Sequence, residues 1–160
     1  MKDNFKITET IYLDEKTKNE LLNLWNTEYP EKLSYNDLGE FDDYLQRLTN
    51  LKHLLLKSEE NIIYGWAFSF ERENEKWFAI ILSEKVQGQG LGRKMLDKIK
   101  QSEYVLNGWV IDHDKEKKKN GRTYTSPLSF YKKCDFEILK KERLELDKIS
   151  AVKIKWTVRK

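Results

Sequence analysis

One stretch near the middle of the chain joins an apolar strand to an amphipathic helix through a turn rich in glycine. Residues 86–96 read VQGQGLGRKML, and Gly88, Gly90 and Gly92 are three of the seven glycines in the 160-residue chain. The apolar run 77–82 precedes this turn, and apolar side chains at helical spacing follow it. Any fold for this chain must therefore place a strand end, a tight turn and a helix N-terminus at one point.

Such a turn is suited to binding phosphate. The first N–H groups of a helix lack partners within it, and the positive end of the helix dipole lies beside them. Glycine lets an anion approach the backbone closely. Arg93 and Lys94 add positive charge in the first helical turn. We predict a phosphate site here; the alternative is a tight turn that needs glycine for its own geometry.

Two common phosphate motifs fit this turn poorly. A P-loop is excluded because the glycine spacing is too short and Met95 follows Lys94. The dinucleotide motif GxGxxG fails at its last position, Arg93, although Asp112 follows about twenty residues later, as that motif requires. The turn also comes after several strands that we expect to be antiparallel, so a dinucleotide site is a distant alternative.

The order of predicted elements indicates a mixed α/β (α+β) fold. Asp14 is a candidate N-cap for the first helix, and Ser126 and Pro127 are candidates for the N-cap and first position of a short late helix. The order βααβββαβαββ favours a mostly antiparallel twisted sheet flanked by helices. With no repeat or linker, we expect one domain over residues 1–160. Apolar periodicity predicts strands over 5–13, 52–57, 62–70, 77–82, 104–111, 136–146 and 151–158, and helices over 15–26, 41–48 and 90–101.

Composition excludes several classes of protein. The chain has no apolar stretch of membrane-spanning length, and its first residues lack a signal-peptide core. Its one cysteine, Cys134, cannot form an internal disulfide and is expected to be a buried thiol. We therefore expect a cytoplasmic protein with no membrane partner.

Charge and histidine content argue against nucleic acid and metal. The net charge is +3 with both signs interspersed, and the one dense basic run is 115–119, so we expect no nucleic-acid partner. Asp112, His113 and Asp114 are adjacent and point in different directions, and the only other histidine is His53. We therefore expect no metal site.

Two signatures resemble the GNAT superfamily of acetyl-CoA-dependent N-acyltransferases. Gln87-x-x-Gly90-x-Gly92 matches that superfamily's Q/R-x-x-G-x-G/A signature. The later segment 126–139, SPLSFYKKCDFEIL, resembles its second signature, in which a short helix carries a Phe-Tyr pair and Gly-Phe leads into a strand. The resemblance extends from about residue 77 to residue 136.

The second signature also contains two departures. Asp135 stands where the family usually has glycine, but aspartate tolerates a left-handed helix end better than most residues. Tyr124 stands where the family often has asparagine, seven residues before Tyr131. The second departure puts one side-chain contact to the cosubstrate in doubt and leaves the expected GNAT fold unchanged.

The resemblance implies acetyl-CoA as cosubstrate and direct attack by an amine on its thioester. It assigns Tyr131 as the general acid that protonates the departing thiolate, a step for which a hydroxyl with a pKa near 10 is suitable. It implies that the backbone of Ile80, Ile81 and Leu82 pairs with the pantetheine arm. The pyrophosphate would lie on the turn formed by Gln87, Gly88, Gln89, Gly90, Leu91, Gly92 and Arg93.

The acceptor and the general base are left open by the sequence. The resemblance implies a small-molecule or peptide amine as acceptor, with the protein a monomer or homodimer. Candidate bases are Glu28, Glu71, Glu73, Asp112 and His113, and water can also relay the proton. A non-catalytic acyl-CoA-binding regulatory module is the alternative function. Most of the following aromatic residues are expected in the core, and a few are candidates for the acceptor cleft, where they would suit an apolar, aromatic or cationic acceptor: Trp25, Tyr29, Tyr35, Trp66, Phe68, Phe70 and Trp109.

Overall fold

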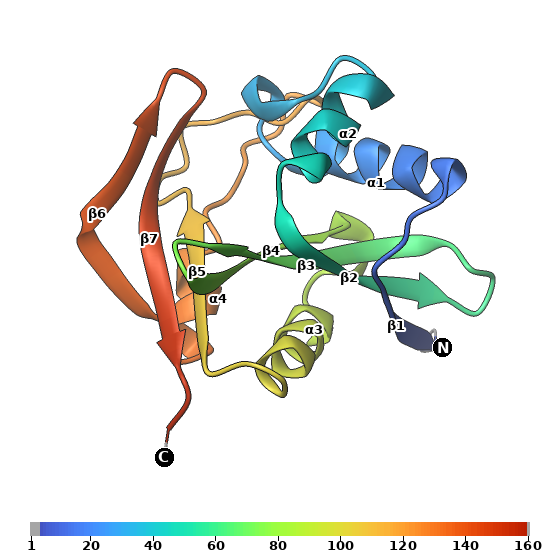
Figure 1. The fold of residues 1–160 in the computed structure, drawn as a ribbon. Coiled ribbons are helices and arrows are strands. Elements are labelled where there is room, and N and C mark those ends of the chain that lie inside the picture. Colours follow the sequence, from blue (N-terminus) through green and yellow to red (C-terminus); the bar gives the residue numbers. More distant parts are fainter. Residues whose placement is uncertain (1–3, 160) are drawn as a thin grey trace.

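The computed structural model describes residues 4–159 and shows helices on both faces of one twisted sheet (Figure 1). The expected order of strands and α-helices is confirmed. Two short 3-10 helices, at Glu31–Leu33 and Glu84–Val86, are additional. The strands are β1 (Phe5–Thr10), β2 (Thr49–Ser58), β3 (Ile63–Arg72), β4 (Glu75–Leu82), β5 (Val105–Val110), β6 (Glu137–Leu146) and β7 (Ile149–Thr157), and the helices are α1 (Glu15–Glu28), α2 (Leu38–Gln46), α3 (Leu91–Lys100) and α4 (Leu128–Lys133).

The sheet opens in its middle, between β4 and β5. The strand order is β1-β2-β3-β4-β5-β7-β6, and every neighbouring pair is antiparallel except β4 and β5. These two parallel strands share a single Cα pair in register, Trp77 with Asn107, among the described residues. Beyond Trp77, β4 runs on to Leu82 paired only with β3. One edge of residues 78–82 therefore lacks a neighbouring strand within residues 4–159.

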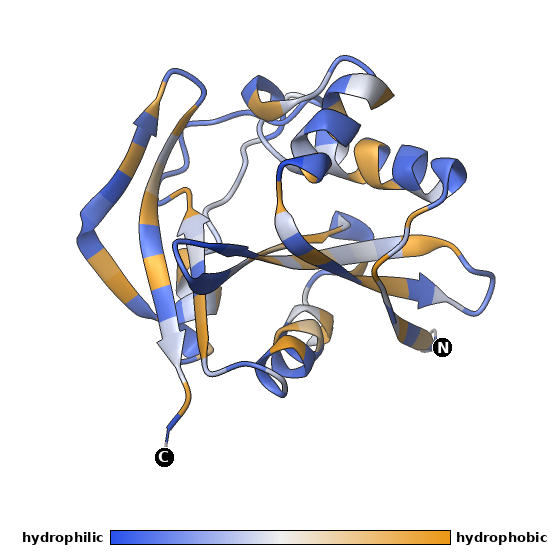
Figure 2. Ribbon diagram, viewed as in Figure 1, coloured by the Kyte–Doolittle hydropathy of each residue, from blue (hydrophilic) through white to orange (hydrophobic). Residues whose placement is uncertain are grey.

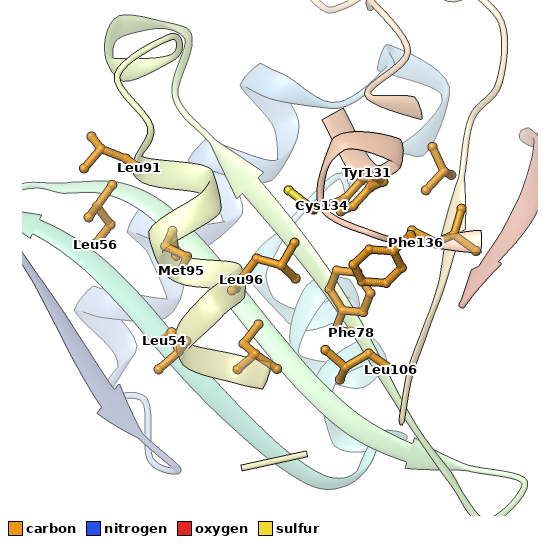
Figure 3. Packing of buried hydrophobic residues seen from close by; sticks show 14 of the residues in the cluster. Leu54, Leu56, Phe78, Leu91, Met95, Leu96, Leu106, Tyr131, Cys134 and Phe136 are labelled. Atoms are coloured by element: carbon orange, nitrogen blue, oxygen red, sulfur yellow. The ribbon is translucent and has the colours of Figure 1, made fainter. Parts of the chain in front are cut away.

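Two apolar cores hold the helices against the sheet. Successive β4 residues point to opposite faces, so Phe78 packs with α3 and α4 while Trp77 packs with α1 and α2. The apolar stripe of α3 faces the sheet in Figure 2. Its buried members include Met95 and Leu96, which Figure 3 shows among the side chains of the core that α3 and α4 form with the sheet.

Most differences from the predicted boundaries are one to three residues at element ends. The first strand stops at Thr10 rather than residue 13, and the second helix begins at Leu38 rather than residue 41 because Asp37 caps it, accepting the amide of Glu40 at 2.9 Å. The last short helix begins at Leu128. Pro127 is therefore its N-cap residue and not its first residue, although Ser126 Oγ still accepts the Leu128 amide at 3.2 Å.

Within residues 4–159, no helix combines the length and apolar character needed to cross a bilayer.

Candidate functional site

The glycine turn presents open backbone at the start of α3. Gly88 and Gly90 have φ values of 81° and 77°, in the left-handed region that favours glycine. A Cβ added to either would meet no heavy atom within 4 Å. Gly90 is the N-cap residue of α3 and offers no side-chain cap, so the first amides of the helix are available to an external acceptor. The local geometry is that of an anion cradle.

Gln87 helps to shape this turn. Its Nε2 donates to the Leu82 carbonyl at 3.0 Å and so ties the turn to the end of β4. Arg93 is partly engaged elsewhere, since its Nη1 donates to the Lys133 carbonyl of α4 at 3.3 Å. The turn is therefore fixed to both the strand before it and the short helix beside it.

A cavity of about 530 Å³ lies beside the turn, and we call it the glycine-turn cavity. Nine of the ten residues that the resemblance assigns to the cosubstrate line this cavity, and the tenth, Gln89, does not. Its walls come from the free end of β4, the turn and α4. The implied residues along it are Ile80, Ile81, Leu82, Gln87, Gly88, Gly90, Leu91, Gly92 and Arg93.

A second cavity, of about 430 Å³, is lined by residues of both β4 and β5, the strands between which the sheet opens. Most of its lining is aromatic or aliphatic, and we call it the aromatic cavity. Of the seven aromatic residues singled out in the sequence, Trp66 and Phe68 are absent from it because they are fully buried under α1 and α2. The other five line it: Trp25, Tyr29, Tyr35, Phe70 and Trp109.

The two cavities share part of their walls. Ile80 contributes from the free end of β4, and Tyr131 contributes from α4. Tyr29, Tyr124 and Pro127 complete the shared set. A molecule in one cavity would therefore approach a molecule in the other beside Ile80 and Tyr131.

Tyr131 is held in place by aromatic packing. Its ring lies edge-on to Phe130, with 5.0 Å between the ring centroids. It also lies edge-on to Phe78 and Phe136, with centroid distances of 5.8 and 5.4 Å (Figure 3). Its hydroxyl makes no hydrogen bond with any residue in the described part of the chain, and burial raises the pKa of Tyr131 well above its usual value. The group is therefore a protonated, unengaged donor at the junction of the two cavities.

Tyr29 and Tyr124 lie across the same junction with their rings 6.3 Å apart. Burial raises the pKa of Tyr124 to about 12 and that of Tyr29 well above its usual value, so both are neutral at physiological pH. Tyr124 occupies the family's asparagine position and contributes a half-buried aromatic wall there. The sequence marked Tyr124 only as a departure and did not place it in the site.

None of the five candidate bases lines the aromatic cavity. Glu71 pairs with Lys76, and His113 Nδ1 accepts the amide of Lys115. Glu73 lies exposed in the turn between β3 and β4. Glu28 lines the glycine-turn cavity but accepts from Lys118 and from the Glu84 amide.

The dinucleotide alternative would need Asp112 to be free. Its carboxylate instead binds the Arg143 guanidinium through two hydrogen bonds, of 2.8 and 3.1 Å. The Arg143 side-chain hydrogen bond lowers the pKa of Asp112. The carboxylate is therefore committed to an ion pair with β6.

Two other residues singled out in the sequence lie where packing predicts. Cys134 is buried beside Tyr131 (Figure 3), and burial raises its pKa, which suits an inert thiol. Asp135 has a φ of 69°, so the predicted left-handed helix end is confirmed without glycine. Over residues 4–159, no three His, Cys, Asp or Glu side chains gather in a way that would hold a metal ion.

Comparison with known families and structures adds independent findings. The family described as "Acetyltransferase (GNAT) domain" matches residues 50–138. This segment includes β4 and α4, which contribute residues to both cavities. Among curated protein sequences, none matches this chain.

Several solved structures share the fold. A protein from Acinetobacter baylyi ADP1, assigned as an acetyltransferase, has a TM-score of 0.72 at 11% identity, over 99% of this chain and 95% of that one. A GNAT-family acetyltransferase from Staphylococcus aureus Mu50 has a TM-score of 0.68 at 16% identity, over 98% and 100%. A phosphinothricin acetyltransferase from Sinorhizobium meliloti, solved with acetyl-CoA, has a TM-score of 0.64 at 10% identity, over 96% and 88%.

The family match spans more than half of the chain, and the solved structures agree with it in fold. The glycine turn and the short α4 correspond to the two signatures that carried the resemblance in sequence. The chain therefore belongs to the GNAT acetyltransferase family.

Proposed function

We propose that this acyltransferase moves an acetyl group from acetyl-CoA to a primary amine by direct attack within a ternary complex. The observation that carries the proposal is the position of Tyr131, whose side chain lines both cavities. Two substrates bound in separate cavities can react only where those cavities meet, and a proton donor stands at that point. We propose a single catalytic domain over residues 1–160, in a cytoplasmic monomer or homodimer.

The glycine-turn cavity fits acetyl-CoA. Left-handed glycines without a Cβ and the uncapped amides of α3 suit a pyrophosphate. The unpaired edge at Ile80, Ile81 and Leu82 offers backbone groups to the amides of a pantetheine arm, as a strand would to its neighbour. Gln87 supports the turn through Leu82, while Gly88, Gln89, Gly90, Leu91, Gly92 and Arg93 form the phosphate end.

The amine would reach the thioester carbonyl from the aromatic cavity. As the C–S bond breaks, the departing thiolate takes the proton of the Tyr131 hydroxyl. A raised pKa keeps that proton on Tyr131 until the thiolate develops, and general acids of this kind contribute about 10²- to 10⁴-fold to a rate. The amine must be neutral when it attacks, and desolvation in an aromatic cavity favours its neutral form.

The test is a calorimetric titration of the purified protein with acetyl-CoA and, separately, with NAD. We expect saturable micromolar binding of acetyl-CoA alone, followed by release of free CoA thiol when a panel of primary amines is added. Failure to bind acetyl-CoA would overturn the proposal. Binding without turnover of any amine, together with a Tyr131→Phe variant that behaves like wild type, would identify a non-catalytic acyl-CoA-binding module instead.

A further inference from the structure

The aromatic cavity contains one charged residue among the described residues that line it, and that residue is a cation. Arg72 lies at the end of β3, where its guanidinium carbon sits 5.0 Å from the ring centroid of Phe70 and 5.4 Å from that of Trp77. The remaining lining is aromatic, aliphatic, proline or glycine, with tyrosine hydroxyls as its polar side-chain groups apart from the indoles. No carboxylate lines this cavity.

The charge of Arg72 is unpaired within residues 4–159, since its guanidinium makes no ion pair or hydrogen bond there. Of the nearby carboxylates, Glu71 pairs with Lys76 and Glu75 pairs with Lys155, while the exposed Glu73 makes no ion pair with Arg72. Stacking on aromatic faces fixes a guanidinium while leaving its N–H edge free. That edge matches a carboxylate, which it can bind with two parallel hydrogen bonds.

The wall under Arg72 holds a second donor without a partner. Trp77 is buried, and its indole Nε1 has no hydrogen-bond acceptor among the described residues. A buried N–H without an acceptor lowers the stability of the folded state, and a hydrogen bond to a bound molecule would remove that cost. Arg72 is exposed and free to bind an anion, and the Trp77 indole is a buried donor without a partner, so an anionic or strongly accepting group at this end of the cavity would suit both.

We infer that the acceptor is an aromatic or otherwise apolar primary amine that carries a carboxylate, and that Arg72 binds the carboxylate. This inference rests on the proposed function and names the substrate class for that site. The aromatic walls would bury the apolar body, and the amine would point toward Tyr131. A polyamine is disfavoured, because its second positive charge would meet Arg72 with no carboxylate to pair it.

The same arrangement accounts for the lack of a general base in the aromatic cavity. Burial and a nearby positive charge both lower the pKa of an amine. An amine placed between aromatic walls and Arg72 would therefore shed its proton to water more readily than in solution. An aromatic amine is already neutral near pH 7, so it needs no base before it attacks, and the N–H proton that it loses after attack would pass to water or to the Tyr131 oxygen that has protonated the thiolate.

The experiment compares amines that differ only in the carboxylate: tryptophan with tryptamine, and 4-aminophenylacetate with 4-methylaniline, with spermidine as a polycation. CoA thiol release and calorimetric binding to the CoA-loaded protein are both measured. We expect kcat/KM to be roughly tenfold or more higher for the carboxylate member of at least one pair, the size typical of a charge-assisted hydrogen bond. Arg72→Met should abolish that preference and leave acetyl-CoA affinity unchanged.

Arg47→Met is the matched control. Arg47 is an exposed cation at the end of α2 and does not line the aromatic cavity, so its loss should preserve the carboxylate preference. The inference is overturned if no carboxylate-bearing amine binds or reacts, if spermidine is preferred, or if Arg72→Met retains the preference. Acetyl-CoA titration of the same samples separates this failure from failure of the proposed function, because only the latter abolishes acetyl-CoA binding.

Discussion

Lys118 Nζ lies 3.0 Å from Glu28 Oε1, and this ion pair joins the end of α1 to the loop between β5 and α4. Glu28 is 6% exposed, and its other oxygen accepts the Glu84 amide at 3.1 Å. One carboxylate thus ties together three segments that surround the glycine turn. The Glu28 carboxylate is engaged in these structural contacts, which argues against Glu28 as the proton acceptor.

Replacing Glu28 with glutamine should therefore destabilise the protein without removing a catalytic base. Losing the Glu28 charge leaves Lys118 with Glu84, a more exposed partner at 3.3 Å, which should lower the free energy of unfolding by about 1–3 kcal/mol. Urea unfolding measures this change. The acid limb of the kcat/KM pH profile should keep its shape. Exposed Glu31→Gln is the control, and a lost acid limb in Glu28→Gln would instead make Glu28 the base.

Gly90→Ala should weaken acetyl-CoA binding. Alanine at a φ of 77° costs about 1 kcal/mol of stability, and its Cβ would project into the space that the phosphates would occupy. We expect the dissociation constant for acetyl-CoA, measured by calorimetry, to rise about tenfold or more. Gly121→Ala is a close control, because Gly121 has a φ of 84° and open surroundings but lies outside the glycine-turn cavity.

The comparison separates backbone strain from cradle geometry. Both variants should lose similar stability, and only Gly90→Ala should lose affinity. Equal acetyl-CoA affinities in the two variants would show that the turn needs glycine for its own geometry and holds no phosphate.

Local sequence patterns predicted much of the fold. Periodicity gave the order of strands and α-helices, and the left-handed helix end expected at Asp135 is present. These features depend on a few adjacent residues. The observed ends of elements differ from the predicted ends where a capping residue such as Asp37, rather than apolar periodicity, sets the boundary.

The division of the aromatic residues could not be read from the sequence. Period two places Trp66, Phe68 and Phe70 on one face, but their burial depends on helices far along the chain. Phe41 of α2 packs 5.7 Å from Trp66, and Tyr44 packs 6.4 Å from Phe68. Phe70, further toward the strand end, is left to line the cavity together with Arg72, and no local pattern predicts this placement.

Tyr131→Phe should lower kcat by about 10²-fold or more while leaving acetyl-CoA affinity nearly unchanged. The substitution removes the donor hydroxyl but keeps the ring packed against Phe78 and Phe136. Tyr104→Phe, at an exposed tyrosine, should have no effect. CoA thiol release under saturating substrates measures the change, and wild-type kcat in Tyr131→Phe would disprove the general-acid role.

The pH profile provides a separate test of Tyr131. A general acid acts in its protonated form, which is present below its pKa. Because burial raises that pKa well above its usual value, the wild-type kcat should show no alkaline decline from Tyr131 up to about pH 10. A decline centred near pH 8 or 9 that disappears in Tyr131→Phe would contradict the buried, protonated state.

His53 should make the stability of the protein depend on pH in a defined window. It is 2% exposed, and its Nδ1 accepts a hydrogen bond from Trp66 Nε1 at 3.0 Å. Burial lowers the pKa of His53 to about 4, against about 6.5 in an unfolded chain. Between these values the unfolded state binds a proton that the folded state does not. Stability should therefore fall as the pH drops from about 6.5 to about 4, by roughly 3 kcal/mol or less.

Urea unfolding of wild type and His53→Gln across pH 4 to 7.5 isolates this contribution. Carboxylates titrate in both proteins, so their effect cancels in the difference between the two curves. The variant should be less stable near pH 7, and the gap should narrow as the pH falls because only the wild type loses the histidine contribution. His113→Gln, at the chain's only other histidine, should retain the wild-type slope. Parallel curves for wild type and His53→Gln would show that His53 is protonated in the folded protein or titrates equally in both states.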